Sequence, residues 1–157
     1  MGNLRVIPSL PEHIPYVAGN MRAEEVAEVW AAGHATPGEA LERALAASDM
    51  AWTVFEGERD VPMAMFGRVR PSLMADTGAL WCLVTDDVSR WKVPFAKRSR
   101  EYVAVMLNDV ERLENYIDVR CRGGIVWLRW LGALLDDPKP MGPDKMLFQR
   151  FEIRREG

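Results

Sequence analysis

The sequence predicts an α+β protein with α/β/α layers, in which a mixed, mostly antiparallel sheet of six or seven strands is accompanied by four helices. The 157 residues suit a single domain over 1–157. Apolar residues follow helical spacing from about position 12 to 49 and strand spacing from 50 to 84. Residues 79–135 then run strand, loop, helix, strand, helix. The strand at 79–84 is apolar without alternation, which is typical of a central strand covered on both faces.

Composition and charge narrow the classes of partner. Hydrophobic residues make up 48% of the chain and charged residues 27%, as in ordinary globular domains. The net charge of -3 gives no overall attraction to nucleic acid or to an anionic membrane, so we expect neither partner, and any anion site must be local. No apolar run approaches the ~18 residues of a membrane span. The nine methionines and six tryptophans suggest a loosely specified core or an adaptable surface, such as a homodimer interface.

The start of the chain and its cysteine and histidine content predict a cytoplasmic protein without a metal. Residues 1–5 lack the apolar segment of a secretory signal. Two cysteines, Cys82 and Cys121, make no disulfide framework, so a reduced cytoplasmic setting is the default. His13 and His34 have no second ligand at metal spacing, which argues against a zinc site.

The first half of the chain has one particularly clear helix start. Thr36 suits the N-cap, Pro37 the first helical position, and Glu39 closes a capping box. The elements predicted up to position 84 are a strand at 4–7, a helix at 12–32 that breaks near Gly19 and Asn20, a helix at 36–49, and an antiparallel meander of strands at 51–55, 61–69 and 79–84.

Three glutamates, Glu24, Glu25 and Glu28, lie along the second half of the helix at 12–32. A carboxylate there could act as a general base or bind an amine, which makes Glu25 and Glu28 candidate catalytic residues. The alternative is a solvated helix face, where glutamates are common.

The second half of the chain alternates strands and helices. A polar loop precedes a helix that starts near Pro94, with a core stripe of Phe95, Tyr102, Val103, Met106, Leu107, Val110 and Leu113. After it we expect a strand at 114–119, a loop at 120–124, a short helix capped by Gly132, a strand at 133–135, an irregular loop at 136–145 and a last strand at 146–153.

Positive charges gather around the start of the helix at Pro94. They are Arg90, Lys92, Lys97, Arg98 and Arg100. Cations at a helix N-terminus oppose the helix dipole, at about 0.3–1 kcal/mol each at the surface, whereas the free backbone N–H groups there favour an anion. A phosphate-bearing ligand would turn this repulsion into attraction. The alternative is a solvated face that is partly neutralised by Asp86, Asp87 and Glu101.

The order of the elements, β-α-α-β-β-β-α-β-α-β-β, resembles that of the GNAT superfamily of N-acetyltransferases over nearly the whole chain. The most specific local similarity lies at 124–133, Gly-Ile-Val-Trp-Leu-Arg-Trp-Leu-Gly-Ala. It resembles the GNAT segment in which a small residue, an aromatic, a tyrosine and a leucine lead into Gly-Phe. Residues 4–21 also resemble a GNAT first strand and helix. Within this fold, the whole sequence further resembles phage-borne GNAT-like proteins of virion assembly.

The resemblance implies a site between two splayed strands. In GNAT enzymes acetyl-CoA lies between the strands that correspond to 79–84 and 114–119. Backbone groups of Leu83, Val84 and Thr85 would then pair with pantetheine, and the following loop and helix start would cradle the pyrophosphate. The implied residues of that cradle are Arg90, Lys92, Val93, Lys97 and Arg98. An acetyl group would pass from acetyl-CoA directly to a primary amine, which would enter from the side of the first two helices.

Three positions depart from the GNAT pattern. In the usual Arg/Gln-x-x-Gly-x-Gly/Ala loop, glycines let backbone N–H groups approach the phosphates. Counting from Arg90, this sequence has Val93 and Phe95 at those positions, with Pro94 between them. Leu128 takes the position of the usual tyrosine acid. Cys121 takes that of the usual CoA-facing Asn, which makes Cys121 a further candidate for both cofactor binding and catalysis.

The two cysteines have two interpretations. In a GNAT fold both Cys82 and Cys121 would lie near the splayed strands, so either thiol could line the cleft. Arg120 and Arg122 flank Cys121 and would favour its thiolate. The alternative for each cysteine is a buried, inert thiol.

Two functions from different classes follow. The first is a GNAT-type N-acyltransferase whose partners are an acyl-CoA, held by basic side chains instead of a glycine loop, and an amine. The second is a GNAT-derived binding or assembly module without catalysis, of phage or prophage origin, whose partner is a phage or host protein. The basic helix start favours the first function, and the altered loop and missing tyrosine favour the second.

Overall fold

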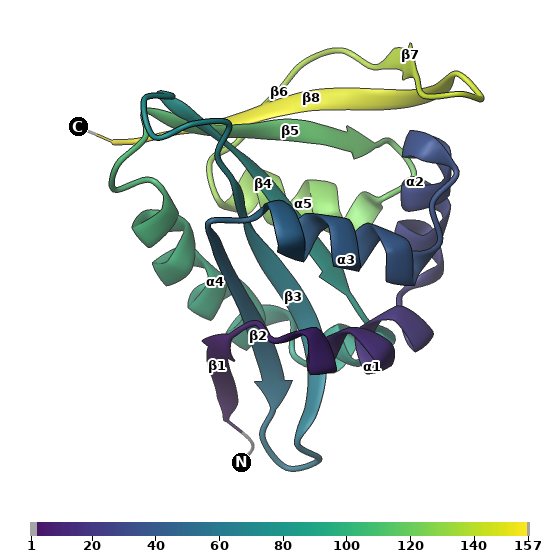
Figure 1. The fold of residues 1–157 in the computed structure, drawn as a ribbon, viewed down its shortest axis with the longest axis vertical. Helices are drawn as coiled ribbons and strands as arrows, with labels where there is room; N and C mark the ends of the chain where they lie inside the picture. Colours follow the sequence, from purple (N-terminus) through teal and green to yellow (C-terminus); the bar gives the residue numbers. More distant parts are fainter. Residues whose placement is uncertain (1–2, 157) are drawn as a thin grey trace.

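A computed structural model describes residues 3–156 as one eight-stranded mixed sheet with helices on both faces (Figure 1). Met1, Gly2 and Gly157 lie outside the described residues, and so does part of the start in which we found no secretory signal. The strands are β1 (Leu4–Pro8), β2 (Met50–Glu56), β3 (Val61–Val69), β4 (Thr77–Val84), β5 (Arg112–Asp118), β6 (Leu134–Leu135), β7 (Lys139–Met141) and β8 (Met146–Arg154). The helices are α1 (Ile14–Gly19), α2 (Ala23–Gly33), α3 (Pro37–Ala47), α4 (Lys92–Met106) and α5 (Arg122–Trp130), with 3-10 turns η1 (Pro11–His13) and η2 (Asp86–Arg90).

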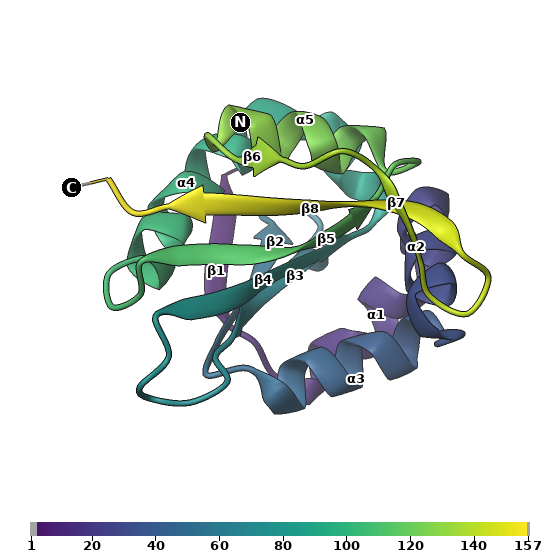
Figure 2. The ribbon, with the colours of Figure 1, turned by 90° about the horizontal axis from the view of Figure 1, so that it is seen from above.

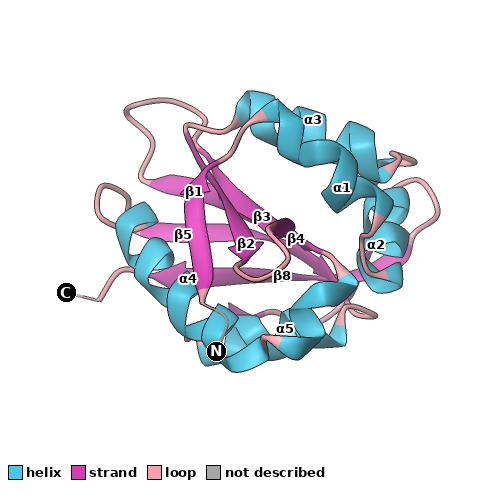
Figure 3. Cartoon of the chain, turned by 90° about the horizontal axis from the view of Figure 1, so that it is seen from below, coloured by secondary structure: helices cyan, strands magenta, loops and turns pink. Residues whose placement is uncertain are grey.

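The sheet separates two groups of helices, as the predicted α/β/α layering requires. Helices α1 and α3 lie on one side of the strands, and α4 and α5 lie on the other (Figures 2 and 3). Val17, Leu41 and Met65 belong to the core under α1 and α3. The larger core under α4 and α5 includes Phe66 and Met106. None of the helices within 3–156 combines the length and apolar character that crossing a bilayer requires.

The predicted N-terminus of α3 is confirmed in detail. The Glu39 backbone N–H donates to Thr36 Oγ1 at 3.2 Å, and the Thr36 backbone N–H donates to Glu39 Oε1 at 3.0 Å. Pro37 is the first helical residue. These reciprocal bonds satisfy donors that a helix start otherwise leaves free, so the sequence sets this boundary locally.

The predicted break in the first helix has a structural role. The chain leaves α1 at Gly19 and enters α2 at Ala23. Between them, Met21 forms a bridge with Thr85, and the Arg22 backbone N–H donates to the Val84 carbonyl at 3.0 Å. The break therefore docks against the end of β4 and brings the first turn of α2 to that edge.

The fourth helix is shorter than its apolar stripe predicted. It ends at Met106, so Val110 lies in a turn and Leu113 in β5, although both are buried. The buried Arg68 guanidinium, reaching from β3, donates to the Met106 carbonyl at 2.6 Å and also bonds Asp109. This pairing satisfies a carbonyl at the end of the helix and holds the following turn.

The structure differs from the sequence-based prediction in three smaller features. The polar loop after β4 contains the 3-10 turn η2, and the irregular loop at 136–145 contains β7, which pairs with β8. The break divides the first helix in two. The described residues therefore form eight strands and five α-helices, against six or seven strands and four helices expected. Gly132 caps α5 as expected, with a φ of 89° in the left-handed region.

The two central strands separate after a short common stretch. Strands β4 and β5 are parallel and pair only from Thr77–Ala79 with Arg112–Glu114. Beyond this stretch β4 stays with β3 as far as Val84, and β5 stays with β8 as far as Asp118. Figure 1 shows the two strands diverging, and the predicted splay is thereby confirmed.

Candidate functional site

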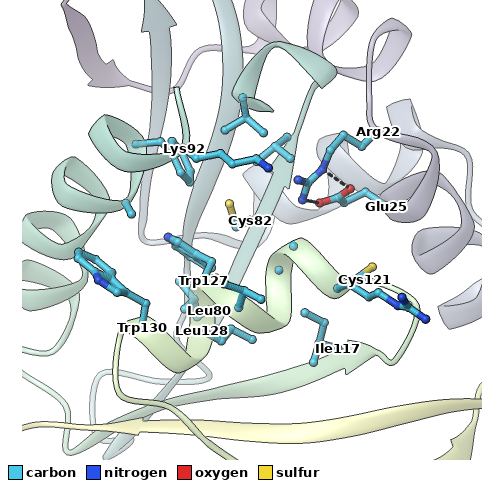
Figure 4. Close-up of a pocket in the computed structure, with 18 of the residues that line it drawn as sticks. Arg22, Glu25, Leu80, Cys82, Lys92, Ile117, Cys121, Trp127, Leu128 and Trp130 are labelled. Carbon is cyan, nitrogen blue, oxygen red and sulfur yellow. Dashed lines mark hydrogen bonds and ion pairs between the residues drawn. The ribbon is translucent and has the colours of Figure 1, made fainter. Parts of the chain in front are cut away.

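A cavity of about 560 Å³ lies where β4 and β5 part (Figure 4). Its walls come mainly from the two strand ends, the first half of α2, the start of α4 and the inner face of α5. Most of the lining side chains are apolar, and the charged ones come from three elements. Arg22, Glu25 and Glu28 belong to the α2 side, Lys92 and Lys97 belong to the α4 side, and Arg122 stands at the start of α5. Figure 4 shows Lys92 extending into the cavity and the Arg22–Glu25 pair beyond it.

The free edge of β4 presents backbone groups to this cavity. The Thr85 N–H donates to the Met63 carbonyl of β3, so Leu83 also directs its backbone groups toward β3. The backbone N–H and C=O groups of Cys82 and Val84 alternate with those of Leu83 and Thr85. They therefore point away from β3, into the gap between β4 and β5. Two carbonyls on that side have partners: Val84 accepts from the Arg22 N–H, and Leu80 accepts from Asn115 Nδ2 at 2.9 Å. The Cys82 amide lies between these two positions, on the open edge.

Glu28 is a carboxyl group whose acidity is tuned by its surroundings. It is partly buried on α2, and its Oε2 accepts the backbone N–H of Asp118 at 2.9 Å. Burial raises the pKa of Glu28 from 4.5 to about 7, and the Asp118 N–H opposes part of that increase. A carboxyl group with a pKa near 7 exchanges protons at neutral pH, which suits a general base.

Glu25 has a different environment although it lies on the same helix. Its carboxylate makes a bidentate pair with the Arg22 guanidinium, from Nε at 3.0 Å and from Nη2. Burial raises the pKa of Glu25, and Arg22 opposes this increase. Because Glu25 is already committed to an ion pair, Glu28 is the better placed of the two candidate bases.

Both cysteines line the cavity, but neither carries the features of an activated thiol. Cys121 is buried, and its Sγ lies 3.3 Å from the Glu24 carbonyl, to which it donates. Burial and the nearby Glu28 and Glu25 carboxylates raise the pKa of Cys121, which favours the interpretation of a buried, inert thiol over a thiolate. Arg120 instead pairs with Asp118 at 2.7 Å. Burial likewise raises the pKa of Cys82.

The predicted phosphate cradle is divided between residues at the cavity and residues away from it. Lys92, Val93 and Lys97 line the cavity. Arg90 is exposed and pairs with Asp87 at 3.2 Å, and Arg98 pairs with Glu101 at 3.6 Å; neither lines the cavity. Both arginines have part of their charge offset by a carboxylate, so the cations best placed for an anionic ligand are those that line the cavity without such a partner among the described residues: Lys92, Lys97 and Arg122.

The residues predicted for pantetheine are also divided. Val84 lines the cavity. The Leu83 side chain packs in the core under α1 and α3. Thr85 is fully buried, and its hydroxyl accepts the Asp87 N–H at 3.2 Å at the start of η2. Leu83 and Thr85 therefore hold the end of β4 in place, whereas Val84 and its neighbour Cys82 direct backbone groups from the free edge of β4 into the cavity.

The start of α4 offers few backbone donors, as the altered loop predicted. Pro94 has no N–H, and the Phe95 N–H already donates to the Trp91 carbonyl at 2.8 Å. Lys92 and Val93 are the first two residues of the helix, where N–H groups have no intrahelical acceptor. Leu128, at the position of the usual tyrosine, is buried and lines the cavity with an apolar side chain.

Sequence reasoning missed several polar residues of the cavity. Arg22 lies just after the predicted helix break, and its place next to that break is the feature of the sequence that could have marked it as a site residue. Asn115 is the first polar side chain of β5 beyond the stretch that pairs with β4, and its Nδ2 donates a hydrogen bond to the Leu80 carbonyl. Arg122 was considered only as a neighbour of Cys121, although it lines the cavity at the start of α5.

The sheet, the splay and the cleft together define the GNAT acetyltransferase fold. Solved structures with this fold include the ribosomal-protein-S5-alanine acetyltransferase of Vibrio fischeri, at 10% identity over 99% of this chain and 95% of that chain, with a TM-score of 0.67. The spermidine N-acetyltransferase of Vibrio cholerae in complex with CoA and spermine is similar at 9% identity, over 97% of this chain and 95% of that chain, also with a TM-score of 0.67.

These comparisons establish the fold and go no further. Identities of 9% and 10% carry no information on substrate or activity. No family model and no curated protein matches the sequence.

Proposed function

We propose that the protein is an N-acyltransferase that moves an acyl group, acetyl in the first instance, from acyl-CoA to a primary amine. The observation that supports this function best is the cavity between β4 and β5, which has a carboxyl group of pKa about 7 on one side and two lysines on the other. A base and an anion site on opposite sides of one cleft suit a negatively charged donor and a protonated amine.

The residues present suit CoA in three respects. Lys92 and Lys97 supply positive charge at the mouth for phosphate groups. The Cys82 backbone groups and the Val84 N–H on the open edge of β4 suit the amides of pantetheine, which need partners when they are buried. The apolar walls suit the aliphatic parts of the donor. Phosphate binding here would depend mainly on side chains, because Pro94 and Phe95 add no free N–H to those of Lys92 and Val93.

The chain's contribution to chemistry would centre on Glu28. The ionised carboxylate takes a proton from the substrate ammonium, and the free amine nitrogen then bonds to the thioester carbonyl carbon. The C–S bond breaks, the sulfur leaves with its electron pair, and the second proton that the nitrogen loses as the amide forms passes to that sulfur to give the thiol. Acyl-CoA supplies the activated acyl group. No covalent enzyme intermediate is needed, which agrees with the raised pKa of both cysteines.

A thermal melt tests the donor directly. An acyl-CoA at about 100 times its Kd stabilises the folded state by about 2.7 kcal/mol, a shift of roughly 5–11 °C for a domain of this size. We expect such a shift with millimolar acetyl-CoA, CoA or a longer acyl-CoA, and thiol release when a primary amine is added. A melt that none of these compounds moves would rule out the enzyme.

The second candidate function is a binding or assembly module that lacks catalysis, of phage or prophage origin, acting on a phage or host protein. Pro94 at the helix start and Leu128 in place of a tyrosine support it, because both remove groups that GNAT catalysis commonly uses. The similar structures give no support for a phage origin. An unchanged melt, together with self-association into a homodimer in light scattering, would favour this function over the enzyme.

A further inference from the structure

The parallel pairing of β4 and β5 ends where a side chain enters between the strands. The last paired residues are Ala79 and Glu114. If the pairing continued, the next bond would join the Tyr116 N–H to the Leu80 carbonyl, because bonds between parallel strands recur at every second residue. Both groups instead bond the Asn115 carboxamide. Its Nδ2 donates to the Leu80 carbonyl at 2.9 Å, and its Oδ1 accepts the Tyr116 N–H at 2.9 Å.

The Asn115 carboxamide therefore takes the place of one direct bond between the strands. A carboxamide carries both a donor and an acceptor, so it satisfies β4 and β5 at once, and neither strand leaves a group unpaired where they part. The neighbours of Asn115 on the same face of β5 are Leu113 and Ile117, both buried and apolar. Asn115 is thus a polar side chain in an apolar row, at the position where the strands diverge.

The next N–H group of β5 on this side is also bonded to a side chain. The Asp118 N–H donates to Glu28 Oε2 at 2.9 Å. In continued pairing this N–H would instead reach the Cys82 carbonyl. Asn115 and Glu28 together thus occupy the two N–H groups through which β5 could pair further with β4. The Cys82 backbone groups consequently face the gap.

The separation of the strands matters for binding because the cavity is the space between them. Strand edges with free N–H and C=O groups tend to pair. If β4 and β5 paired further, a ligand would have to break those bonds, and its apparent affinity would fall with the fraction of open molecules. A side chain that replaces the strand pairing keeps the cleft open before any ligand arrives.

We propose that Asn115 is a positioning residue, whose carboxamide holds β4 and β5 apart and so keeps the Cys82 backbone groups accessible to a ligand. The proposal rests on the proposed function for the identity of that ligand, an acyl-CoA. A pantetheine amide then occupies the next position along the gap, between the Cys82 N–H and the Tyr116 carbonyl, as the Asn115 carboxamide occupies the one before it.

Asn115→Ala tests this role, because it removes the carboxamide and adds no bulk. We expect new interstrand nuclear Overhauser contacts between Leu80 and Tyr116 in the protein without ligand, since their backbone groups can then bond directly. Affinity for acetyl-CoA, measured by calorimetry, should fall about tenfold or more, because the closed form competes with binding. Asn108→Ala, at an exposed asparagine outside the cavity, should change neither result.

A second variant separates this role from simple packing. Asn115→Asp keeps the size of the side chain and an acceptor for the Tyr116 N–H. It should show no new contacts and should bind acetyl-CoA within about threefold of the wild type, because it loses one hydrogen bond to a half-buried carbonyl. New contacts between Leu80 and Tyr116 in Asn115→Asp would contradict the proposal.

The outcomes also distinguish this proposal from the one on which it rests. Asn115→Ala without new contacts, or with the acetyl-CoA affinity of the wild type, would overturn the role of Asn115 and leave the acyltransferase standing. If the wild type binds no CoA, the proposed function fails, and the Overhauser contacts alone decide whether Asn115 separates the strands. If Asn115→Ala does not fold, Asn115→Ser, which is too short to bridge both strands, replaces it with the same expected results.

Discussion

The two charged walls of the cleft differ in how they hold their charge. On the α4 wall, Lys92 and Lys97 are exposed and meet water, so their charges are screened and act on anions additively and weakly. On the α2 wall, Glu25 is buried and Glu28 partly buried, and their pKa values are raised. Exposure thus makes the α4 wall suited to binding an anionic ligand, and burial makes the α2 wall suited to proton transfer.

The largest expected effect comes from the carboxyl group on the buried wall. Glu28→Gln keeps an acceptor for the Asp118 N–H but removes the base, so kcat/KM for the amine should fall by about 10²–10⁴-fold. Binding of acyl-CoA, followed by thermal shift, should not change. Glu42→Gln, an exposed substitution on α3, serves as the matched control. If Glu28→Gln kept the wild-type kcat/KM, the general base would have to be a residue other than Glu28.

The next effect concerns stability and pH. The folded-state pKa of Glu28 is raised above its ordinary value, so its favourable contribution is full below about pH 4.5 and is lost as pH rises through about 7. Between pH 5 and pH 8 the wild type should therefore lose more unfolding free energy than Glu28→Gln, by up to about 3 kcal/mol. Urea unfolding at both pH values measures it, and equal losses in the two proteins would show that the pKa of Glu28 is ordinary.

A smaller effect is expected on the exposed wall. The double substitution Lys92→Ala with Lys97→Ala should weaken acyl-CoA binding about tenfold at low salt, and by less at high salt, because exposed charges are screened. Lys139→Ala, an exposed lysine on β7 outside the cavity, is the control. Titration at two ionic strengths measures the difference; a loss independent of salt would mean that the lysines act through packing.

The smallest effect is expected from the two arginines of the predicted cradle that lie away from the cavity. Arg90→Ala and Arg98→Ala should each change acyl-CoA affinity by less than about twofold, because both arginines lie outside the cavity and are paired with Asp87 and Glu101. A loss of acyl-CoA affinity as large as that of the double lysine variant would mean that the phosphates of CoA bind nearer to η2, outside the cavity.

The sequence predicted the scaffold because its signals are local. The capping residues Thr36 and Glu39, the glycine break before α2 and the apolar run of β4 each depend on neighbours in the chain. The end of α4 was missed because it depends on Arg68, which reaches the Met106 carbonyl from a strand 38 residues away in sequence.

The candidate site was only partly predictable for the same physical reason. Glu28 was identified as a candidate, but its raised pKa comes from burial beside the end of β5, which no local pattern encodes. Two interpretations were open for Cys121, a thiolate favoured by its sequence neighbours Arg120 and Arg122 or a buried, inert thiol. In the fold Arg120 turns to Asp118, and carboxylates from α2 take its place beside the thiol.

A crystal structure with bound CoA would test most directly the claim that the splay between β4 and β5 is an acyl-CoA site. We expect pantetheine beside the backbone of Cys82 and Val84, phosphates within reach of Lys92 and Lys97, and the sulfur near Glu28. CoA bound outside the splayed strands, or the cleft filled by the chain's own side chains at saturating CoA, would contradict this account.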